Sequence, residues 1–136
     1  MKKHFYYPHT VTPDEIDELN HAGNYHYLKW MQYAAIAHST SNGWSPQRYI
    51  ELGAGWMVRS HSIVYLKPAL EGDTILIKTW VSNMKPATSL RHYEVRNDAG
   101  IILASAETDW AFVNYEKQKP ARIPLEVASC FVIVND

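Results

Sequence analysis

The stretch that decides the fold is Asp17-Glu-Leu-Asn-His21-Ala-Gly-Asn24-Tyr-His-Tyr27-Leu-Lys-Trp30. It begins as a polar turn and continues into a long helical pattern that reaches about Ser41. In this pattern, side chains that favour the interior recur at helical spacing, at Tyr27, Met31, Ala34, Ala35 and His38. The other faces are also apolar, with Leu28, Trp30, Ile36 and Ala37. A helix that is apolar nearly all round is typically buried on most sides.

The ends of this helix carry ordinary boundary signals. Asn24 is a good N-cap residue, and Gly43 stands where a C′ residue belongs. Upstream, residues 12–15 read as a capping box with proline at the first helical position, which predicts a helical turn over Pro13–Leu19. Downstream, Ser45-Pro46 predicts a second, short helix over Pro46–Leu52.

Beyond Gly55 the hydrophobic pattern changes to a period of two, which predicts strands at Met57–Lys67, Thr74–Met84, Ser89–Arg96 and Ile101–Tyr115. The turns between them are short, and Asn97–Gly100 is the strongest hairpin signal, so the strands form an antiparallel meander. Residues 4–11 add an edge strand, interrupted by Pro8. We therefore expect an α+β fold in which a five- or six-stranded antiparallel sheet curls around the long helix.

Composition limits the classes of protein that this chain can represent. With 136 residues, we expect one domain over residues 1–136. A net charge of -1 gives no global basic field for nucleic acid or anionic lipid. The single cysteine, Cys130, excludes a disulfide framework within the chain. The N-terminus lacks the apolar segment of a signal peptide, and no run is long enough to span a membrane, so we expect a cytoplasmic protein.

The sequence resembles the hot-dog-fold thioesterases of the 4-hydroxybenzoyl-CoA thioesterase type, which have acyl-carrier-protein thioesterases among their relatives. That family's pattern is D-x-x-x-H-x-N-N-x-x-Y, and this chain carries Asp17, His21, Gly23, Asn24 and Tyr27 in the matching positions. Glycine thus replaces the first asparagine. The segments Ile63–Asp73, Thr108–Val113 and Arg122-Ile-Pro124 are similar to the family's later strands, so the resemblance covers nearly the whole chain.

The resemblance implies that Asp17 is the catalytic carboxylate of a hydrolase acting on an acyl-CoA or acyl-carrier-protein thioester. A helix N-terminus offers unpaired N–H groups to a developing oxyanion, and a carboxylate just before it can activate water or attack the thioester directly. The alternative is that Asp17 only hydrogen-bonds within its turn. His21 would orient Asp17, donate to the leaving thiolate or bind substrate, or else hydrogen-bond its own loop. Asn24 would fix the turn that binds the oxyanion.

The remaining expectations concern substrate, metal and partners. Tyr27 and Trp30 are packing residues that we also expect to line the acyl pocket, and surface cations would hold coenzyme A, with Lys85, Arg91 and Arg122 as candidates. Coenzyme A enters only as part of the substrate; no other cofactor is expected, and no metal, because the His and Asp spacing fits no zinc motif. The open sheet edges predict a homodimer or homotetramer.

Two other functions remain open at this point. A hot-dog dehydratase or hydratase would act on hydroxyacyl thioesters with a histidine and an acidic residue. A non-catalytic module would bind acyl groups without a base. The D-x-x-x-H spacing favours the thioesterase.

Overall fold

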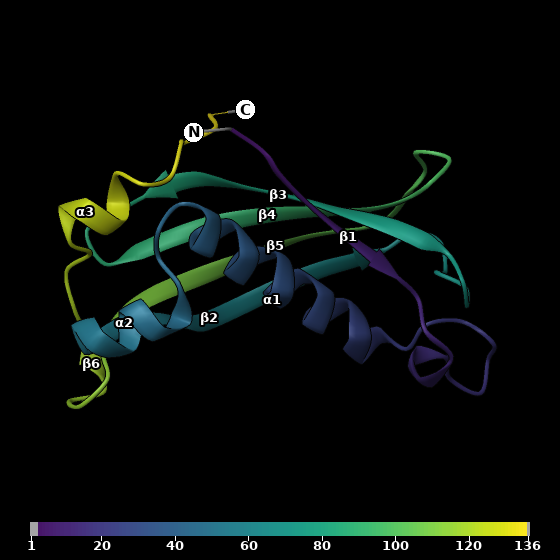
Figure 1. The fold of residues 1–136 in the computed structure, drawn as a ribbon, viewed down its shortest axis with the longest axis horizontal. Helices are drawn as coiled ribbons and strands as arrows, with labels where there is room; N and C mark the ends of the chain where they lie inside the picture. Colours follow the sequence, from purple (N-terminus) through teal and green to yellow (C-terminus); the bar gives the residue numbers. More distant parts are fainter. Residues whose placement is uncertain (1–2, 136) are drawn as a thin grey trace.

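The computed structural model describes residues 3–135, which form a curled antiparallel sheet with a long helix across one face (Figure 1). The strands follow the order β1 (Phe5–Thr10), β3 (Thr74–Met84), β4 (Thr88–Asn97), β5 (Ile102–Asn114) and β2 (Ala54–Tyr65), and the short β6 (Lys119–Pro120) pairs with β5. The helical segments are η1 (Pro13–Glu15), α1 (Asn24–Ser41), α2 (Pro46–Leu52) and α3 (Leu125–Ala128). The predicted α+β hot-dog fold is confirmed.

Helix α1 buries one face against the sheet. Met31, Ala34 and Ala35 are 1%, 0% and 7% exposed, as predicted, and they share a core with residues of β3, β4 and β5 such as Ile77 and Val95. The opposite face is exposed, with Tyr25, Tyr33 and Ile36. The prediction of a helix buried on most sides is therefore wrong for the isolated chain, because the described residues place no second layer over α1. No helix among residues 3–135 is long and apolar enough to span a membrane.

Helix α1 has the predicted bounds, Asn24–Ser41, but its N-cap lies one residue earlier than predicted. Gly23 occupies the N-cap position in an extended conformation, and Asn24 is the first helical residue. The helical turn predicted over Pro13–Leu19 is also shorter, and spans only Pro13–Glu15 as a 3₁₀ helix with the predicted capping box. It ends there because Ile16 is extended and bridges Ala22 across the following loop.

The other boundaries follow the sequence closely. Helix α2 ends at Gly53, whose φ of 82° lets the chain reverse directly into β2 at Ala54, three residues earlier than predicted. The C-terminal segment holds one element that the sequence did not predict, the single-turn helix α3. It begins after Pro124, and its Val127 packs with Phe112 in a second, smaller core at the α2 end of the molecule. In Figure 1, α2 and α3 lie at the left end, and the loop before α1 lies at the right end.

Candidate active site

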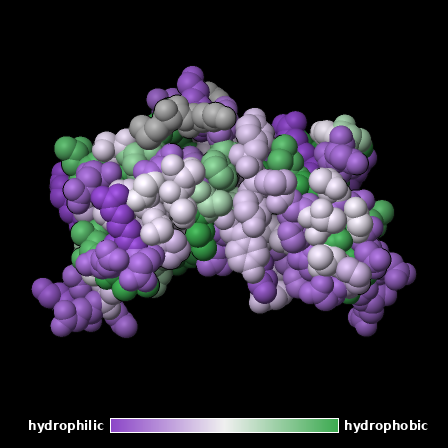
Figure 2. Space-filling model, viewed as in Figure 1, coloured by the Kyte–Doolittle hydropathy of each residue, from purple (hydrophilic) through white to green (hydrophobic). Residues whose placement is uncertain are grey.

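The loop of residues 16–23 brings the chain back on itself just before α1. The backbone N–H of Asp17 donates to the carbonyl of His21 at 2.9 Å, and the N–H of Asn20 donates to the carbonyl of Asp17 at 3.1 Å. Asn20 has a φ of 67°, a conformation that asparagine tolerates better than most residues. The loop forms a hydrophilic corner of the molecule, at the lower right in Figure 2. The side chains of residues 17–20 are exposed to solvent, whereas Ala22 is buried in the core.

Asp17 lies beside the N-terminus of α1. Its Oδ1 accepts a hydrogen bond from the N–H of Leu19 at 2.8 Å, and its side chain is 37% exposed. A Cβ placed on Gly23, the N-cap residue, would lie 4.0 Å from the Cβ of Asp17. The N–H groups of Asn24 and Tyr25 have no acceptor within residues 3–135. A carboxylate and two unpaired donors therefore share one solvent-facing corner.

His21 and Asn24 stand at the same corner. The Nδ1 of His21 lies 3.9 Å from the Oδ1 of Asp17 and 3.3 Å from the carbonyl oxygen of Ala22, so the ring has both a carboxylate and its own loop within reach. Asn24 is exposed in the first turn of α1. The structure thus brings together the three residues that the sequence predicted as catalytic, Asp17, His21 and Asn24.

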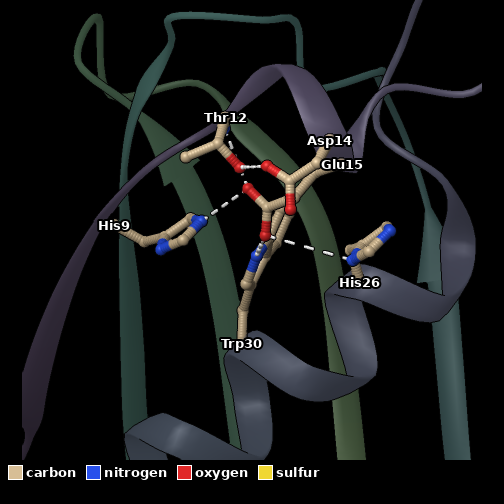
Figure 3. Close-up of polar contacts among 6 residues, drawn as sticks. All are labelled: His9, Thr12, Asp14, Glu15, His26 and Trp30. Atoms are coloured by element: carbon tan, nitrogen blue, oxygen red, sulfur yellow. Dashed lines mark hydrogen bonds and ion pairs between the residues drawn. The ribbon is translucent and has the colours of Figure 1, made fainter.

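Glu15 is a residue of this region that the sequence analysis treated only as part of a capping box. Figure 3 shows its carboxylate at the centre of a cluster. It accepts hydrogen bonds from the N–H of Thr12 at 2.9 Å, from His9 Nε2 at 2.8 Å and from Trp30 Nε1 at 2.7 Å, and His26 Nδ1 lies 4.0 Å away. Burial acts to raise the pKa of Glu15, but these hydrogen bonds outweigh it and lower the pKa to about 2.

The Glu15 cluster fixes the loop to the helix. The carboxylate ties η1 to Trp30 in the second turn of α1, and the carbonyl of Glu15 accepts from the N–H of Gly23 at 3.1 Å. The capping-box spacing gave the bond to Thr12, but no local pattern could give a bond to an indole fifteen residues later. Despite the histidines nearby, no three metal-ligating side chains within residues 3–135 come together as a site for a metal ion.

Tyr27 and Trp30, predicted as substrate-binding residues, lie in the core beneath this corner. The Tyr27 hydroxyl accepts a hydrogen bond from the N–H of Ala69 at 3.0 Å, and burial raises its pKa. Trp30 exposes none of its surface, and its ring packs 4.8 Å from that of Tyr27. In this structure both residues support the site by holding α1 against the neighbouring loops.

The three predicted cations lie far from the loop. Lys85 is exposed in the turn between β3 and β4, at the opposite end of α1 from Asp17 (Figure 1). Arg122 is exposed and lies near Lys85, because the N–H of the next residue, Ile123, donates to the carbonyl of Pro86 at 2.8 Å.

Arg91 was predicted as a surface cation, and this is wrong, since it is only 5% exposed. Alternate residues of β4 face α1 and are buried, and Arg91 belongs to that row between Ser89 and Tyr93.

Known proteins resemble this chain in sequence and in fold. A profile of the thioesterase-like superfamily matches residues 11–131. A protein of Bacillus subtilis (strain 168) named "Putative acyl-CoA thioesterase YneP" is 26% identical over 106 residues, which make up 78% of this chain and 77% of that protein.

Solved structures share the fold at low sequence identity. Slr0204, a 1,4-dihydroxy-2-naphthoyl-CoA thioesterase from Synechocystis, has a TM-score of 0.86 at 21% identity, with 93% of this chain and 94% of that chain covered. SAV2348 from Staphylococcus aureus, solved in complex with CoA, has a TM-score of 0.89 at 17% identity, with 96% and 82% covered. The family match extends from Val11, directly after β1, to Phe131 in the C-terminal segment after α3. The chain therefore belongs to the thioesterase-like superfamily, a family of thioester hydrolases, and it has that family's hot-dog fold.

Proposed function

We propose that this protein hydrolyses an acyl-CoA or acyl-carrier-protein thioester to the free acid and the thiol, with Asp17 as general base or nucleophile. The observation that carries the proposal is the position of the Asp17 carboxylate beside the unpaired N–H groups at the start of α1. Thioester hydrolysis needs both: a base or nucleophile near the carbonyl carbon, and donors for the oxygen that becomes negative.

The reaction follows from these two groups. The thioester oxygen would accept from the N–H groups of Asn24 and Tyr25, whose positive dipole end stabilises the tetrahedral oxyanion. As base, Asp17 takes a proton from water while the water oxygen bonds to the carbonyl carbon. The C–S bond then breaks, and the thiolate takes up a proton, for which His21 is within reach of the site. As nucleophile, Asp17 forms an acyl anhydride as the thiolate leaves, and water then releases the acid.

The test is a thiol-release assay on short, long and aromatic acyl-CoAs. Asp17→Asn keeps the shape of the side chain but removes the charge, so turnover of the best substrate should fall about 10²–10⁴-fold. The melting temperature should change little, because the carboxylate is exposed in a loop. Glu18→Gln is the matched control, since it removes a neighbouring exposed charge and should keep the wild-type rate. A folded Asp17→Asn enzyme with most of its activity would place the chemistry elsewhere.

The proposal also concerns the chemical class of the acyl group. The resemblance to the 4-hydroxybenzoyl-CoA thioesterase type, carried by Asp17, His21, Asn24 and Tyr27, supports an aromatic acyl-CoA among the substrates. Lys85 belongs to the turn between β3 and β4, which lies at the opposite end of α1 from the loop before it (Figure 1), so we expect Lys85 to reach the coenzyme A handle from a second copy of the chain.

A homodimer or homotetramer is therefore part of the proposal. Strand β2 is an edge of the sheet whose one partner within residues 3–135 is β5, and its exposed residues include Met57, Val64 and Tyr65. A long exposed apolar edge favours pairing with another chain. Light scattering at micromolar concentration should give at least twice the 15.6 kDa chain mass.

The edge can be tested by substitution. Val64→Lys on β2 should weaken the assembly, whereas Leu125→Lys, at an equally apolar but isolated exposed position in α3, should not. A wild-type monomer at micromolar concentration would contradict this part of the proposal.

A further inference from the structure

A cavity lies at the α2 end of the molecule, away from the Asp17 corner. Its volume is about 200 Å³, and aromatic side chains dominate its wall: Trp44, Tyr49, Trp56, Trp110, Tyr115 and Phe131. The exposed helix residues Gln32 and Ile36 also line it, so it opens to the surface along α1. These two residues lie eight and twelve positions beyond Asn24, or about 12 and 18 Å along the helix axis.

Arg91 is the charged residue in the cavity wall, and it is buried. Its Nη1 donates to His38 Nδ1 and to the Thr79 hydroxyl, each at 3.0 Å, and its guanidinium carbon lies 5.6 Å from the centre of the Phe131 ring. Both of these hydrogen bonds come from the same nitrogen, Nη1. A guanidinium carries five N–H donors, so most of its capacity is unused.

The groups around Arg91 carry no negative charge at neutral pH. No carboxylate within residues 3–135 lies within 4.0 Å of the guanidinium. A guanidinium cannot accept a hydrogen bond, so His38 accepts through Nδ1 and is neutral; burial, and then Arg91 itself, lower its pKa to about 3. Burial raises the pKa of Tyr49, and it raises the pKa of Cys130 to about 11, so both stay protonated.

A buried cation without an anion is costly unless something compensates for it. Arginine does not escape the cost by losing its proton, because its pKa is too high. A bound anion would supply the missing charge and use the free face of the guanidinium. A carboxylate matches the fork of an arginine, and the aromatic wall suits an apolar body attached to that carboxylate. A free inorganic anion would leave the aromatic wall without a partner.

We propose that this cavity binds a small carboxylate with an apolar or aromatic body, with the carboxylate held by Arg91. A cavity of about 150 Å³ is large enough for benzene, so about 200 Å³ suits a single ring that carries a carboxylate. Resting on the proposed function, the carboxylate has two sources. It is either the free acid that hydrolysis releases, or a second carboxylate at the far end of the acyl group.

Binding is measured without turnover. Benzoate should quench the tryptophan fluorescence of the wild-type protein, because Trp44, Trp56 and Trp110 line the cavity. Benzamide has the same shape without the charge, and inorganic phosphate has charge without the ring, so both should bind at least ten-fold more weakly. Equal binding of benzoate and benzamide in the wild-type protein would overturn the proposal. This comparison does not depend on the folding of any variant.

Variants then locate the carboxylate. Arg91→Gln should weaken benzoate binding about 10- to 100-fold, from the loss of a charged hydrogen-bond partner. Arg91→Lys keeps the charge and should recover part of the affinity. Arg96→Gln is the matched control on the same strand, because Arg96 already pairs with Glu94 at 2.7 Å; it should bind benzoate as the wild type does. Unchanged binding by a folded Arg91→Gln protein would also overturn the proposal.

The thiol-release assay distinguishes the two sources. A preference for dodecanedioyl-CoA, whose chain is long enough to reach from Asp17 to this cavity, over dodecanoyl-CoA assigns the site to a second carboxylate of the substrate if Arg91→Gln abolishes that preference. Benzoate binding without such a preference assigns it to the free acid. Turnover of acyl-CoAs without benzoate binding would overturn this inference and leave the proposed function intact. Benzoate binding without turnover of any acyl-CoA would support the carboxylate site and contradict the proposed function.

Discussion

A charged side chain that is mostly buried lies beside each end of α1, Glu15 at one end and Arg91 at the other, and the two have opposite surroundings. At the N-terminal end, the Glu15 carboxylate accepts three hydrogen bonds and lies near a further histidine. At the C-terminal end, the Arg91 guanidinium has two neutral acceptors and an aromatic ring, and no anion within residues 3–135. A charge with its full set of partners stabilises a fold. A charge that lacks an opposite charge leaves binding capacity for a ligand.

The largest change in stability is expected from a substitution of Glu15. Glu15→Ala removes the acceptor for Thr12, His9 and Trp30 at once, and leaves the indole N–H buried without a partner. We expect the free energy of unfolding to fall by about 3–5 kcal/mol, as when one partner of a buried charged cluster is lost. Urea denaturation measures it. Glu18→Ala, an exposed glutamate in the next loop, is the control, and a similar small loss in both variants would refute a structural role for Glu15.

Acid should affect the two ends in different pH ranges. Folded His38 has a pKa of about 3 against an ordinary 6.5, because of burial and then Arg91, and folded Glu15 has a pKa of about 2 against 4.5. Between pH 6.5 and 4.5, the unfolded chain binds a proton at His38 that the folded chain does not. Over these two units the stability should therefore fall by roughly 2–3 kcal/mol at His38, and Glu15 adds its loss only below pH 4.5.

The variant His38→Gln separates the two ranges. It keeps a polar side chain beside Arg91 but removes the titrating ring, so its stability should be nearly constant from pH 6.5 to 4.5 and should still decline below that. Urea midpoints at both pH values decide the matter. A variant that loses as much stability as the wild type over this range would assign the acid sensitivity to other groups.

The smallest effect, and one of opposite sign, is expected at Arg91. Arg91→Met replaces an unpaired buried charge by an apolar side chain of similar length, although it leaves His38 without a donor. We expect the stability at pH 7 to rise by about 1 kcal/mol, since apolar replacement of buried charges is often stabilising. The same change removes a cation that lowers the pKa of folded His38, so the loss of stability below pH 6.5 should end at a higher pH and be smaller in total than in the wild type. A clear loss of stability would show that Arg91 supports the fold rather than a ligand.

The sequence could predict the elements whose signals are local. Helix α1 has the predicted bounds, Asn24–Ser41, because helical periodicity and the Gly43 stop signal both lie within the segment. Strand β3 likewise has the predicted bounds. Single-turn α3 was missed because four residues are too few for a periodicity, and its stability depends on Val127 packing against distant Phe112.

In the candidate site, too, the sequence could predict what depends on neighbouring residues and could not predict what depends on distant ones. Asp17, His21 and Asn24 come together because they are close in sequence and one tight loop joins them. The roles of Glu15 and Arg91 depend on partners fifteen and fifty-three residues away, so no local pattern contains them. Burial of Arg91 follows from its register on β4, but an arginine in an alternating pattern is ordinarily assigned to the solvent face.

Gly23 makes the environment of Asp17 separable from the fold. Its φ of -68° is open to any residue, and an added Cβ would meet only ordinary contacts, at 3.6 Å from His26 and 4.0 Å from Asp17. Gly55 is the opposite case, since an added Cβ would collide with the Tyr115 ring. Position 23 can therefore take many side chains next to the carboxylate while the backbone keeps its course. Selection, natural or in the laboratory, can vary the polarity beside the Asp17 carboxylate at this one codon while the fold stays the same.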